Sequence, residues 1–405
     1  MKIKAKIIND PVYGFIRFPE PELMRIIEHP WFQRLRHIRQ MGMAHLVYPG
    51  ATHTRFHHSL GACHLMEQAL DVLKLKGVDV SKEDCLAARI AILLHDIGHG
   101  PFSHALEHSL VQGLQHETIS GLIMRALNRQ FNGILENALH VFDQEYPHRY
   151  LHQLVSSQLD VDRMDYLNRD SFYTGVSEGV IGYDRILQML TVVDGSLMVE
   201  EKAVHSVEKF IIARRLMYWQ VYLHKTVLGA EQLLVNILKR ARELAAAGAS
   251  LFRTPALGYF LYGAISTIDF EQDPHHLEQF CKLDDSDVLA SIKVWQNHED
   301  KVLSMLCRML MNRRLYKTVI SSGPLEELLE EKRTALIKAG YDRESVAYFA
   351  FTGTTSNNTY DTEDERITLA MKNGTTCDIS AVENALVNQA LARPVHKNYI
   401  CFVQP

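Results

Sequence analysis

The sequence predicts a mainly α-helical fold with a small β-hairpin and a smaller α/β appendage toward the C-terminal end. Apolar residues recur at the spacing of one helix face through most of residues 21–247, and β-type patterns occur only in short stretches. The chain has 405 residues, more than the roughly 250–300 at which a single hydrophobic core stops growing. We therefore expect a large domain over 1–270, flanking helices included, and a helical and α/β appendage over 271–405.

Prolines, glycines and N-capping residues separate the helical patterns along the chain. The first pattern, residues 21–41, is interrupted at His29-Pro30, where proline is expected to start a second helix. Ser81 is a typical N-cap for a helix that runs to Leu94. Helices are expected over 55–75, 81–94, 104–110, 116–128, 151–168, 183–190 and about 207–247.

The β-type patterns lie in two places. Two short β-prone runs within 191–199 flank Asp194-Gly195, a dipeptide that tight hairpins prefer. Beyond about residue 315 the pattern changes, with a helix near 324–339 and β-like runs at 346–352 and 398–403. We interpret the first as a hairpin on a helical body and the second as the α/β appendage.

The composition excludes several classes of protein. Hydrophobic residues make up 47% and charged residues 22% of the chain, the balance of a globular protein rather than a disordered one. The net charge of −5 gives no general attraction to nucleic acid or anionic lipid. No apolar run reaches the roughly 18 residues of a membrane span, and the six cysteines form no Cys-x-x-Cys pair. We expect a cytoplasmic protein without membrane or nucleic-acid partners.

Histidines are crowded in one part of the chain, since 12 of the 21 lie between His29 and His116. Within that stretch an apolar run ending at Leu94 leads directly into His95-Asp96. A carboxylate at a buried helix end costs several kcal/mol unless it is paired, so a cation or a tight partner is expected beside Asp96. A metal ion would meet this need, although a His-Asp dipeptide alone is also common in proteins that bind none.

Further metal ligands are available on both sides of this dipeptide. His57 and His58 lie upstream, and a helical pattern downstream carries polar side chains on one face. These are Asp162, Asp165, Tyr166 and Arg169, at i, i+3, i+4 and i+7. Two histidines and two carboxylates with open positions suit Mn, Fe, Ni or Zn. Simpler alternatives remain open, with Asp165 and Arg169 as a surface ion pair and His57 as a helix-face residue.

The order His58, His95-Asp96, Asp162 resembles the HD superfamily of metal-dependent phosphohydrolases, whose core is helical. Longer motifs are similar to its deoxynucleoside triphosphate triphosphohydrolase branch, which includes the enzyme that joins a sterile-alpha-motif domain to an HD domain. These motifs are Asn9-Asp10-Pro11, Phe32-Gln33-Arg34-Leu35-Arg36, Arg55-Phe56-His57-His58-Ser59-Leu60-Gly61, His95-Asp96-Ile97-Gly98-His99-Gly100-Pro101-Phe102-Ser103-His104 and Asp162-Arg163-Met164-Asp165-Tyr166. The resemblance covers about residues 6–230, and we expect no sterile-alpha-motif domain.

The resemblance implies a role for each matching residue. It implies one divalent transition metal per subunit (Mn, Fe, Ni or Zn), with Mg²⁺ accompanying the nucleotide. The implied metal ligands are His58, His95, Asp96 and Asp162. The implied catalytic group is His104, with His99, His116 and Glu117 beside it. The implied substrate contacts are Gln40, Met41, Arg55, Arg163, Tyr166, Asp170 and His224.

The sequence departs from that branch at two positions. Gln220 stands four residues before His224, where an arginine on the phosphates is expected, and Arg163 replaces a lysine. Arginine keeps the charge of lysine but changes the geometry of its contacts. The loss of one cation weakens the case for triphosphate recognition unless Arg214 or Arg215 compensates.

The resemblance also implies a homo-oligomer, dimer or tetramer, with a nucleotide effector at a subunit interface. The residues that fall on the effector positions are Lys6, Asn9, Glu28, Gln33 and Arg36. The alternative, in which they form surface ion pairs and a helix cap, remains open.

Three functions are weighed on these residues. The first is hydrolysis of deoxynucleoside triphosphates (dNTPs) to deoxynucleoside and inorganic triphosphate. The second is an HD-type phosphomonoesterase or nucleotidase acting on another nucleotide, which Gln220 favours. The third is a nucleotide sensor without turnover, which would be expected to have damaged metal ligands. The intact ligand set favours an enzyme.

Overall fold

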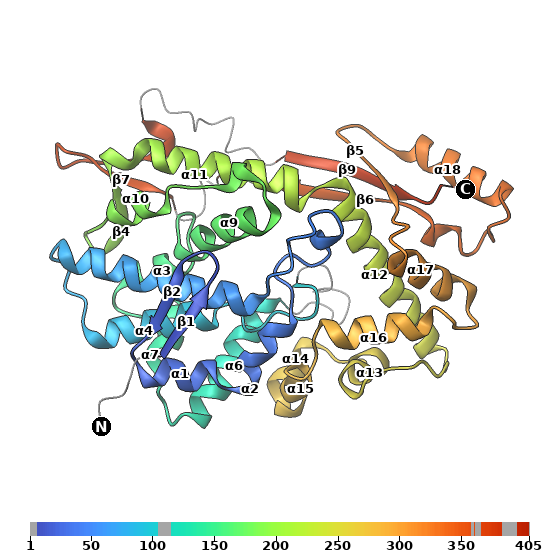
Figure 1. Ribbon diagram of the computed structural model, residues 1–405, viewed down its shortest axis with the longest axis horizontal. Coiled ribbons are helices and arrows are strands. Elements are labelled where there is room, and N and C mark those ends of the chain that lie inside the picture. The colour runs from blue at the N-terminus through green and yellow to red at the C-terminus, as the bar shows by residue number, and fades with distance from the viewer. Residues whose placement is uncertain (1–5, 104–114, 358–359, 361–365, 383–394, 405) are drawn as a thin grey trace.

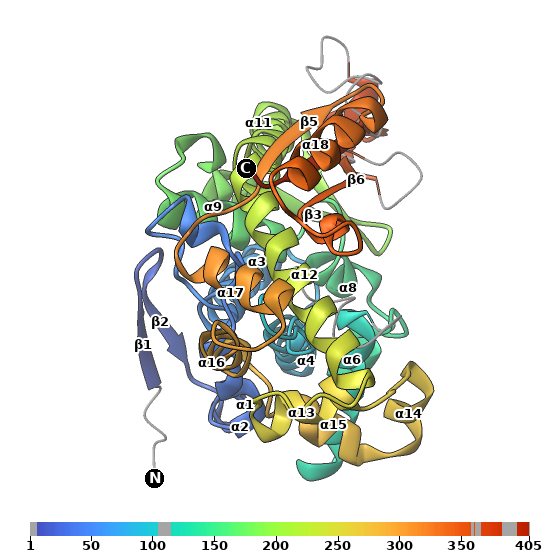
Figure 2. The same ribbon diagram turned by 90° about the vertical axis from the view of Figure 1, so that its right-hand side faces the viewer.

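The computed structural model describes residues 6–103, 115–357, 360, 366–382 and 395–404, and it confirms the mainly α-helical fold. Helices α3, α4 and α9 form the body on one side of Figure 1, and α12 crosses the other side. Turned by 90°, α12 lies in front of α3 and α4 (Figure 2). No described helix is long and apolar enough to cross a membrane.

The first helices begin where the sequence predicts. Helices α1 (Pro21–Ile27) and α2 (Pro30–Gln33) both start at a proline, which needs no hydrogen-bond partner at that position. Helix α3 (Arg55–Leu75) has the predicted bounds. Helix α4 (Lys82–Leu94) is capped by Ser81, whose Oγ accepts from Asp84 N at 3.0 Å. Because α4 ends at Leu94, His95 and Asp96 stand just past the end of a buried helix.

Two helices that the periodicity predicts as continuous are divided. Residues 151–168 belong to α8 (Arg149–Val155) and α9 (Val161–Thr174), because the carboxylate of Asp160 accepts from Arg163 N at 2.7 Å and starts a new helix. Residues 207–247 are divided at Tyr218–Tyr222, a π-turn in which Leu223 N donates to Tyr218 O. Periodicity misses both breaks because the apolar pattern continues through them.

The flanking helices are α11 (Val204–Met217), before the π-turn, and α12 (Lys225–Ala246), which His224 caps. The other described helices are α6 (His116–Gln130), α7 (Glu136–Phe142), α10 (Tyr183–Gln188), α13 (Pro255–Tyr262), α14 (Thr267–Gln272), α15 (Pro274–Phe280), α16 (Asp285–Trp295), α17 (Lys301–Met311) and α18 (Glu326–Lys338). Short 3₁₀ turns lie at Arg34–His37, Ala44–Leu46, Ser177–Gly179, Glu201–Ala203, Val346–Tyr348 and Ile379–Ala381. The helix expected over 104–110 lies outside the described residues.

In the described part of the chain, three small sheets, antiparallel or mixed, accompany the helices. The predicted hairpin is present as β3 (Leu190–Val193) and β4 (Ser196–Glu200), with positive φ at both turn residues. It is extended by β7 (Thr368–Ala370), which pairs in parallel with β4, and then by β8 (Thr376–Asp378), which pairs antiparallel with β7. The appendage holds the sheet β5-β9-β6, formed by Lys317–Ser321, Val395–Phe402 and Ala350–Asn357.

The remaining sheet is a hairpin that the sequence pattern did not predict, β1 (Lys6–Asp10) with β2 (Gly14–Phe18). Its turn uses Gly14 at φ 73° rather than a standard two-residue hairpin signal. Buried side chains from both sides of residue 270 form one continuous hydrophobic core. The division into 1–270 and 271–405 therefore stays a prediction.

Candidate metal centre

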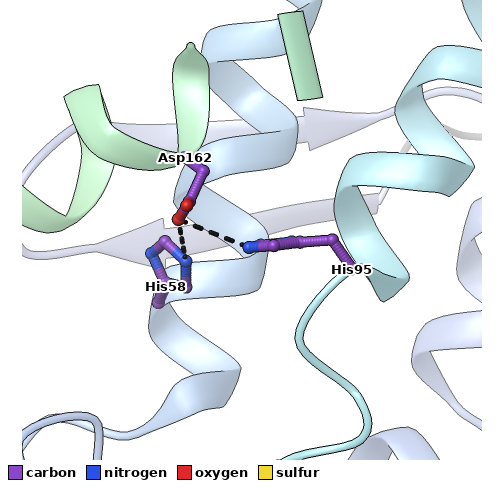
Figure 3. A group of neighbouring side chains, drawn as sticks. All are labelled: His58, His95 and Asp162. Carbon is purple, nitrogen blue, oxygen red and sulfur yellow. Dashed lines mark ion pairs between the residues drawn. The ribbon is translucent and has the colours of Figure 1, made fainter. Parts of the chain in front are cut away.

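Four side chains from α3, the end of α4 and the start of α9 meet at one point. Asp162 Oδ1 lies 3.0 Å from His58 Nε2 and 3.3 Å from His95 Nε2 (Figure 3). Asp96 completes the group, with carboxylate oxygens 3.6 Å from His58 Nε2 and 3.5 Å from His95 Nε2. The four residues that the resemblance implies as metal ligands are thus neighbours, although they lie up to about a hundred positions apart in the chain.

Hydrogen bonds fix which nitrogen of each imidazole faces the centre. His58 Nδ1 donates to Asp165 Oδ2 at 2.8 Å, and His95 Nδ1 donates to Ile92 O at 2.6 Å. A histidine that donates through Nδ1 presents its Nε2 lone pair as a metal ligand. Both Nε2 atoms are buried and face the Asp162 carboxylate, but neither makes a hydrogen bond of acceptable geometry within the described residues. Buried polar atoms are rarely left in this state, so this donor set fits a divalent metal.

A second layer of charge supports His58. Asp165 accepts from Arg169 through both oxygens at 2.9 Å, and Arg169 also donates to Asp10 at 2.8 Å. Neither Asp165 nor Arg169 has exposed side-chain surface, so they are not the surface pair that the sequence left open. Gly61 is required beside them, because a Cβ at that position would overlap both side chains.

The electrostatics of the group favour a bound cation. Burial opposes charge on His58, but Asp162 and Asp165 outweigh it and raise the pKa of His58 to about 10. Burial likewise opposes charge on Asp162, and His95 and His58 together lower the pKa of that carboxyl. The carboxylates therefore hold positive charge at this point, and a metal ion would supply it while displacing protons from the histidines.

A second cluster adjoins the first. Asp96, His99 and His116 could also share an ion, since one ligand atom of each lies within 4.8 Å of the others. His99 stacks on His116 with ring centroids 3.9 Å apart, and its Nε2 lies 3.3 Å from Asp96 Oδ1. Burial and the nearby Arg55 hold the pKa of His99 well below its usual value. Glu117 is exposed beside His116, at 3.3 Å. His104 lies outside the described residues.

A cavity of about 600 Å³ opens from this centre. Six of the seven implied substrate contacts line it: Gln40, Met41, Arg55, Arg163, Tyr166 and Asp170. His224 does not, because it caps α12 by accepting from Thr226 N at 3.2 Å. A larger cavity of about 780 Å³ lies between α17 and β5, away from the candidate ligands, so it is not the site of chemistry on a metal.

Several of the lining residues already have partners. Arg55 donates to Asp96 and, at 2.9 Å, to Ser103 Oγ. Asp170 accepts from His53 at 2.7 Å and from the Tyr222 hydroxyl at 2.7 Å. These bonds hold the two side chains in fixed orientations.

The segment from α11 to α12 contributes further residues to the cavity wall. Of these, only Arg214 had been named from the sequence. They are Arg214, Tyr218, Tyr222, Leu223, Val227 and Glu231, joined by Ser356 of the appendage. Burial lowers the pKa of Arg214, and the neighbouring Arg163 adds to the effect. Arg214 thus lines the cavity, whereas Gln220 does not. A signal for Glu231 existed, because it interrupts an apolar stripe between Val227 and Leu234.

The residues on the implied effector positions make local contacts. Lys6 pairs with Glu28, and Arg36 Nε donates to Gln33 Oε1 at 2.8 Å. Gln33 in turn donates to Ile27 O at 2.6 Å, and Asn9 lies in β1. Such local contacts are those expected if these residues form only surface ion pairs and caps. The effector site stays a prediction.

Comparisons with known proteins agree with this centre. Residues 55–170 match the HD domain, and residues 181–254 match the HD associated region. The uncharacterized protein YwfO of Bacillus subtilis is 35% identical over 98% of this chain and 92% of its own length. Deoxynucleoside triphosphate triphosphohydrolase SAMHD1 of Gallus gallus is 31% identical over 54% of this chain, which spans 43% of that protein.

A solved structure extends the likeness to the whole chain. A phosphohydrolase from Bacteroides thetaiotaomicron is 48% identical, with a TM-score of 0.95 over 99% of this chain and all of that one. A hypothetical protein from Aquifex aeolicus is 25% identical, with a TM-score of 0.70 over 98% of this chain. The fold, the grouped histidines and aspartates and these matches together show that the chain belongs to the HD-domain phosphohydrolases.

Proposed function

We propose that this protein hydrolyses dNTPs to deoxynucleoside and inorganic triphosphate. One observation carries the proposal: a single cavity joins the candidate metal ligands to two neighbouring cations, Arg163 and Arg214, and to the hydrogen-bonded pair Asp170 and Tyr222. The arginines suit the triphosphate of a nucleotide, and Asp170 and Tyr222 suit its sugar. The identity of 28–31% to SAMHD1 proteins supports the same substrate class.

The charged side chains of the wall suit the phosphates. Arg163 and Arg214 would neutralise the chain, and the Tyr166 hydroxyl would donate to a phosphate oxygen. The sugar would lie against Asp170, whose carboxylate has further lone pairs for a 3′-hydroxyl beyond those used by His53 and Tyr222. Gln40 Oε1 is buried without a hydrogen bond and is free to take part. Met41 would crowd a ribose 2′-hydroxyl.

The chemistry would take place at the metal centre. His58, His95, Asp96 and Asp162 would hold the metal. When bound, a divalent metal supplies Lewis-acid activation of a phosphoryl group. Burial and Arg55 lower the pKa of His99, which favours the neutral ring, and a neutral imidazole can accept a proton. His104 would be the main proton-transfer group, with Glu117 as an orienting group. Arg55 keeps the Asp96 carboxylate ionised and oriented.

A product assay tests the proposal directly. Purified protein with Mn²⁺ is incubated with each dNTP, with and without GTP or dGTP, and the products are separated by anion-exchange chromatography. Inorganic triphosphate and deoxynucleoside are expected in equal amounts. Orthophosphate or pyrophosphate without inorganic triphosphate from every dNTP would refute this activity while leaving the family assignment in place.

A phosphomonoesterase or nucleotidase is the second candidate, and one observation favours it. Arg163 is already engaged, 3.2 Å from Asp160 and donating to Ser157 O at 2.6 Å, and Arg55 is paired with Asp96. Arg214 is then the main cation left for a triphosphate. Hydrolysis of deoxynucleoside monophosphates at a kcat/KM above that of dNTPs would favour this candidate.

Arg214→Gln separates the two candidates further. Loss of this cation is expected to lower kcat/KM for dNTPs by about 10- to 100-fold, because a charge-assisted contact to the phosphates is lost. Monophosphate hydrolysis would change less. The matched control is Arg215→Gln, since Arg215 is adjacent in the chain but does not line the cavity.

A further inference from the structure

The wall of the cavity formed by α12 differs in character from the rest. Leu223, Val227 and Glu231 follow one another at intervals of four residues and all line the cavity. Met41 and Ala44 line it as well, and the short turn that begins at Ala44 packs against α12. The metal-ligand candidates lie on α3, just past the end of α4 and on α9, whereas α12 is on the other side of the structure in Figure 1. This wall is therefore apolar except for one carboxyl group.

Glu231 has no recorded hydrogen bond or ion pair within the described part of the chain. The other carboxylates of the cavity wall are engaged: Asp170 with His53 and Tyr222, and Asp96 and Asp162 at the metal centre. The Glu231 side chain is half-buried, and the desolvation that this causes raises its pKa to about 8. No cation contributes to that shift.

The fold itself does not require a glutamate at this position. Glu231 is the seventh residue of α12, beyond the first turn, where a carboxylate would stabilise the helix N-terminus. Its neighbours on the same stripe are apolar, and a leucine or methionine there would avoid the cost of desolvating a carboxyl. A carboxyl that costs stability and opens on a ligand cavity points to a role in binding.

The chemistry of the wall selects which part of a nucleotide it would meet. Phosphates suit this wall poorly, because a carboxylate repels them and the described residues that line it beside Glu231, which are Met41, Ala44, Leu223 and Val227, carry no positive charge. An apolar surface with a single hydrogen-bonding group suits a flat nucleobase, whose faces are apolar and whose edge carries donors and acceptors. We propose that Glu231 accepts a hydrogen bond from the exocyclic amino group of the substrate's base, and so favours amino-bearing bases over thymine and uracil. This inference rests on the proposed function.

The matched pair of substrates is dCTP and dUTP. Their bases have the same size. At position 4 cytosine carries an amino group and uracil a carbonyl oxygen, and at N3 cytosine is an acceptor and uracil a donor. An ionised Glu231 facing position 4 attracts the amino group and repels the carbonyl oxygen. At pH 9, above the raised pKa of Glu231, we expect kcat/KM for dCTP to exceed that for dUTP by about tenfold or more, as for one hydrogen bond to a charged group.

Glu231→Gln removes the distinction, because an amide can accept from cytosine and donate to uracil with nearly equal ease. The ratio of dCTP to dUTP is expected to fall to within about threefold, mainly through a gain for dUTP. The control is Glu243→Gln on the same helix, since Glu243 pairs with Arg240 and Tyr348 outside the cavity. The Glu231→Gln variant should unfold at the same temperature as the parent protein or higher.

Equilibrium dialysis of both nucleotides against metal-depleted protein gives the same ratio without turnover. Hydrolysis with a ratio that Glu231→Gln leaves unchanged overturns the role of Glu231 and leaves the proposed function standing. Binding with a ratio that depends on residue 231, but without hydrolysis of any dNTP, supports this role and refutes the function. A protein that neither binds nor hydrolyses the two nucleotides refutes both.

Discussion

Replacing Asp165 by asparagine tests how far the metal centre depends on a group that does not face the metal. Asp165 Oδ2 accepts from His58 Nδ1 at 2.8 Å and from Arg169 Nε at 2.9 Å, and its Oδ1 accepts from a second Arg169 nitrogen at 2.9 Å. Asparagine has the same shape but carries one donor group. If the amide nitrogen takes the place of Oδ1, it opposes an Arg169 donor. If it takes the place of Oδ2, it opposes Arg169 Nε as well as His58 Nδ1, and the imidazole proton moves to Nε2, the atom that should bind the metal.

Either arrangement weakens the site. Loss of a group that orients a metal-binding histidine typically costs 10–100-fold in affinity, or about 1.4–2.8 kcal/mol. Arg169 keeps its bond to Asp10, so the fold should survive. The measurement is a competition titration of Mn²⁺ or Zn²⁺ against a coloured chelator, with circular dichroism to verify folding.

The control for this titration is Asp71→Asn, which removes a largely exposed carboxylate from α3. Its affinity should match that of the parent protein. A dissociation constant for Asp165→Asn within twofold of the parent value would show that Asp165 does not orient His58 for metal binding.

Three further predictions follow from the same geometry. Asp162→Ala removes the carboxylate shared by both histidines, so dialysed protein should hold no stoichiometric metal by mass spectrometry; full occupancy would exclude Asp162 as a ligand. Gly61→Ala places a methyl group onto Asp165 and Arg169 and should cost about 2 kcal/mol or more of unfolding free energy in urea titrations, whereas an unchanged midpoint would contradict the close packing. The pKa of Glu231 is raised to about 8, so in the folded protein this side chain stays protonated at pH values where it is already ionised in the unfolded chain. Its contribution to stability therefore declines between about pH 4.5 and 8. The melting temperature of Glu231→Gln should rise relative to that of the parent protein from pH 5 to pH 8, and a constant difference would argue against a desolvated carboxyl at this position.

The sequence was sufficient to predict the helices that carry the candidate ligands, because their signals are local. Arg55–Leu75 and the Ser81-capped helix have strong local signals in their caps and periodicity, and His95-Asp96 is conspicuous because charge follows an apolar run. What brings His58, His95 and Asp162 together is tertiary packing, which no local pattern encodes. The resemblance to the HD superfamily supplied that information, and the structure then placed the residues side by side.

Local reasoning failed where long-range contacts decide the outcome. Asp165 and Arg169 have the spacing of an exposed helix pair, yet both are buried because Asp10 from the first hairpin reaches them. That hairpin itself lacks the usual turn dipeptide. Arg214 was noted only as a possible replacement for Gln220, and the structure places it on the cavity wall while Gln220 is exposed.

The π-turn at Tyr218–Tyr222 bears on which changes of length this segment can tolerate. Each residue of an α-helix turns the chain by about 100°, so the eight steps from Arg214 to Tyr222 would leave the two side chains about 80° apart on a regular helix. One additional residue in the wider turn offsets most of that angle, and both side chains line the cavity. Deleting a single residue here would give a more regular helix and turn Tyr222 away from Asp170. The segment can therefore accept substitutions more readily than a change of length, because its number of residues sets the directions in which Arg214 and Tyr222 point.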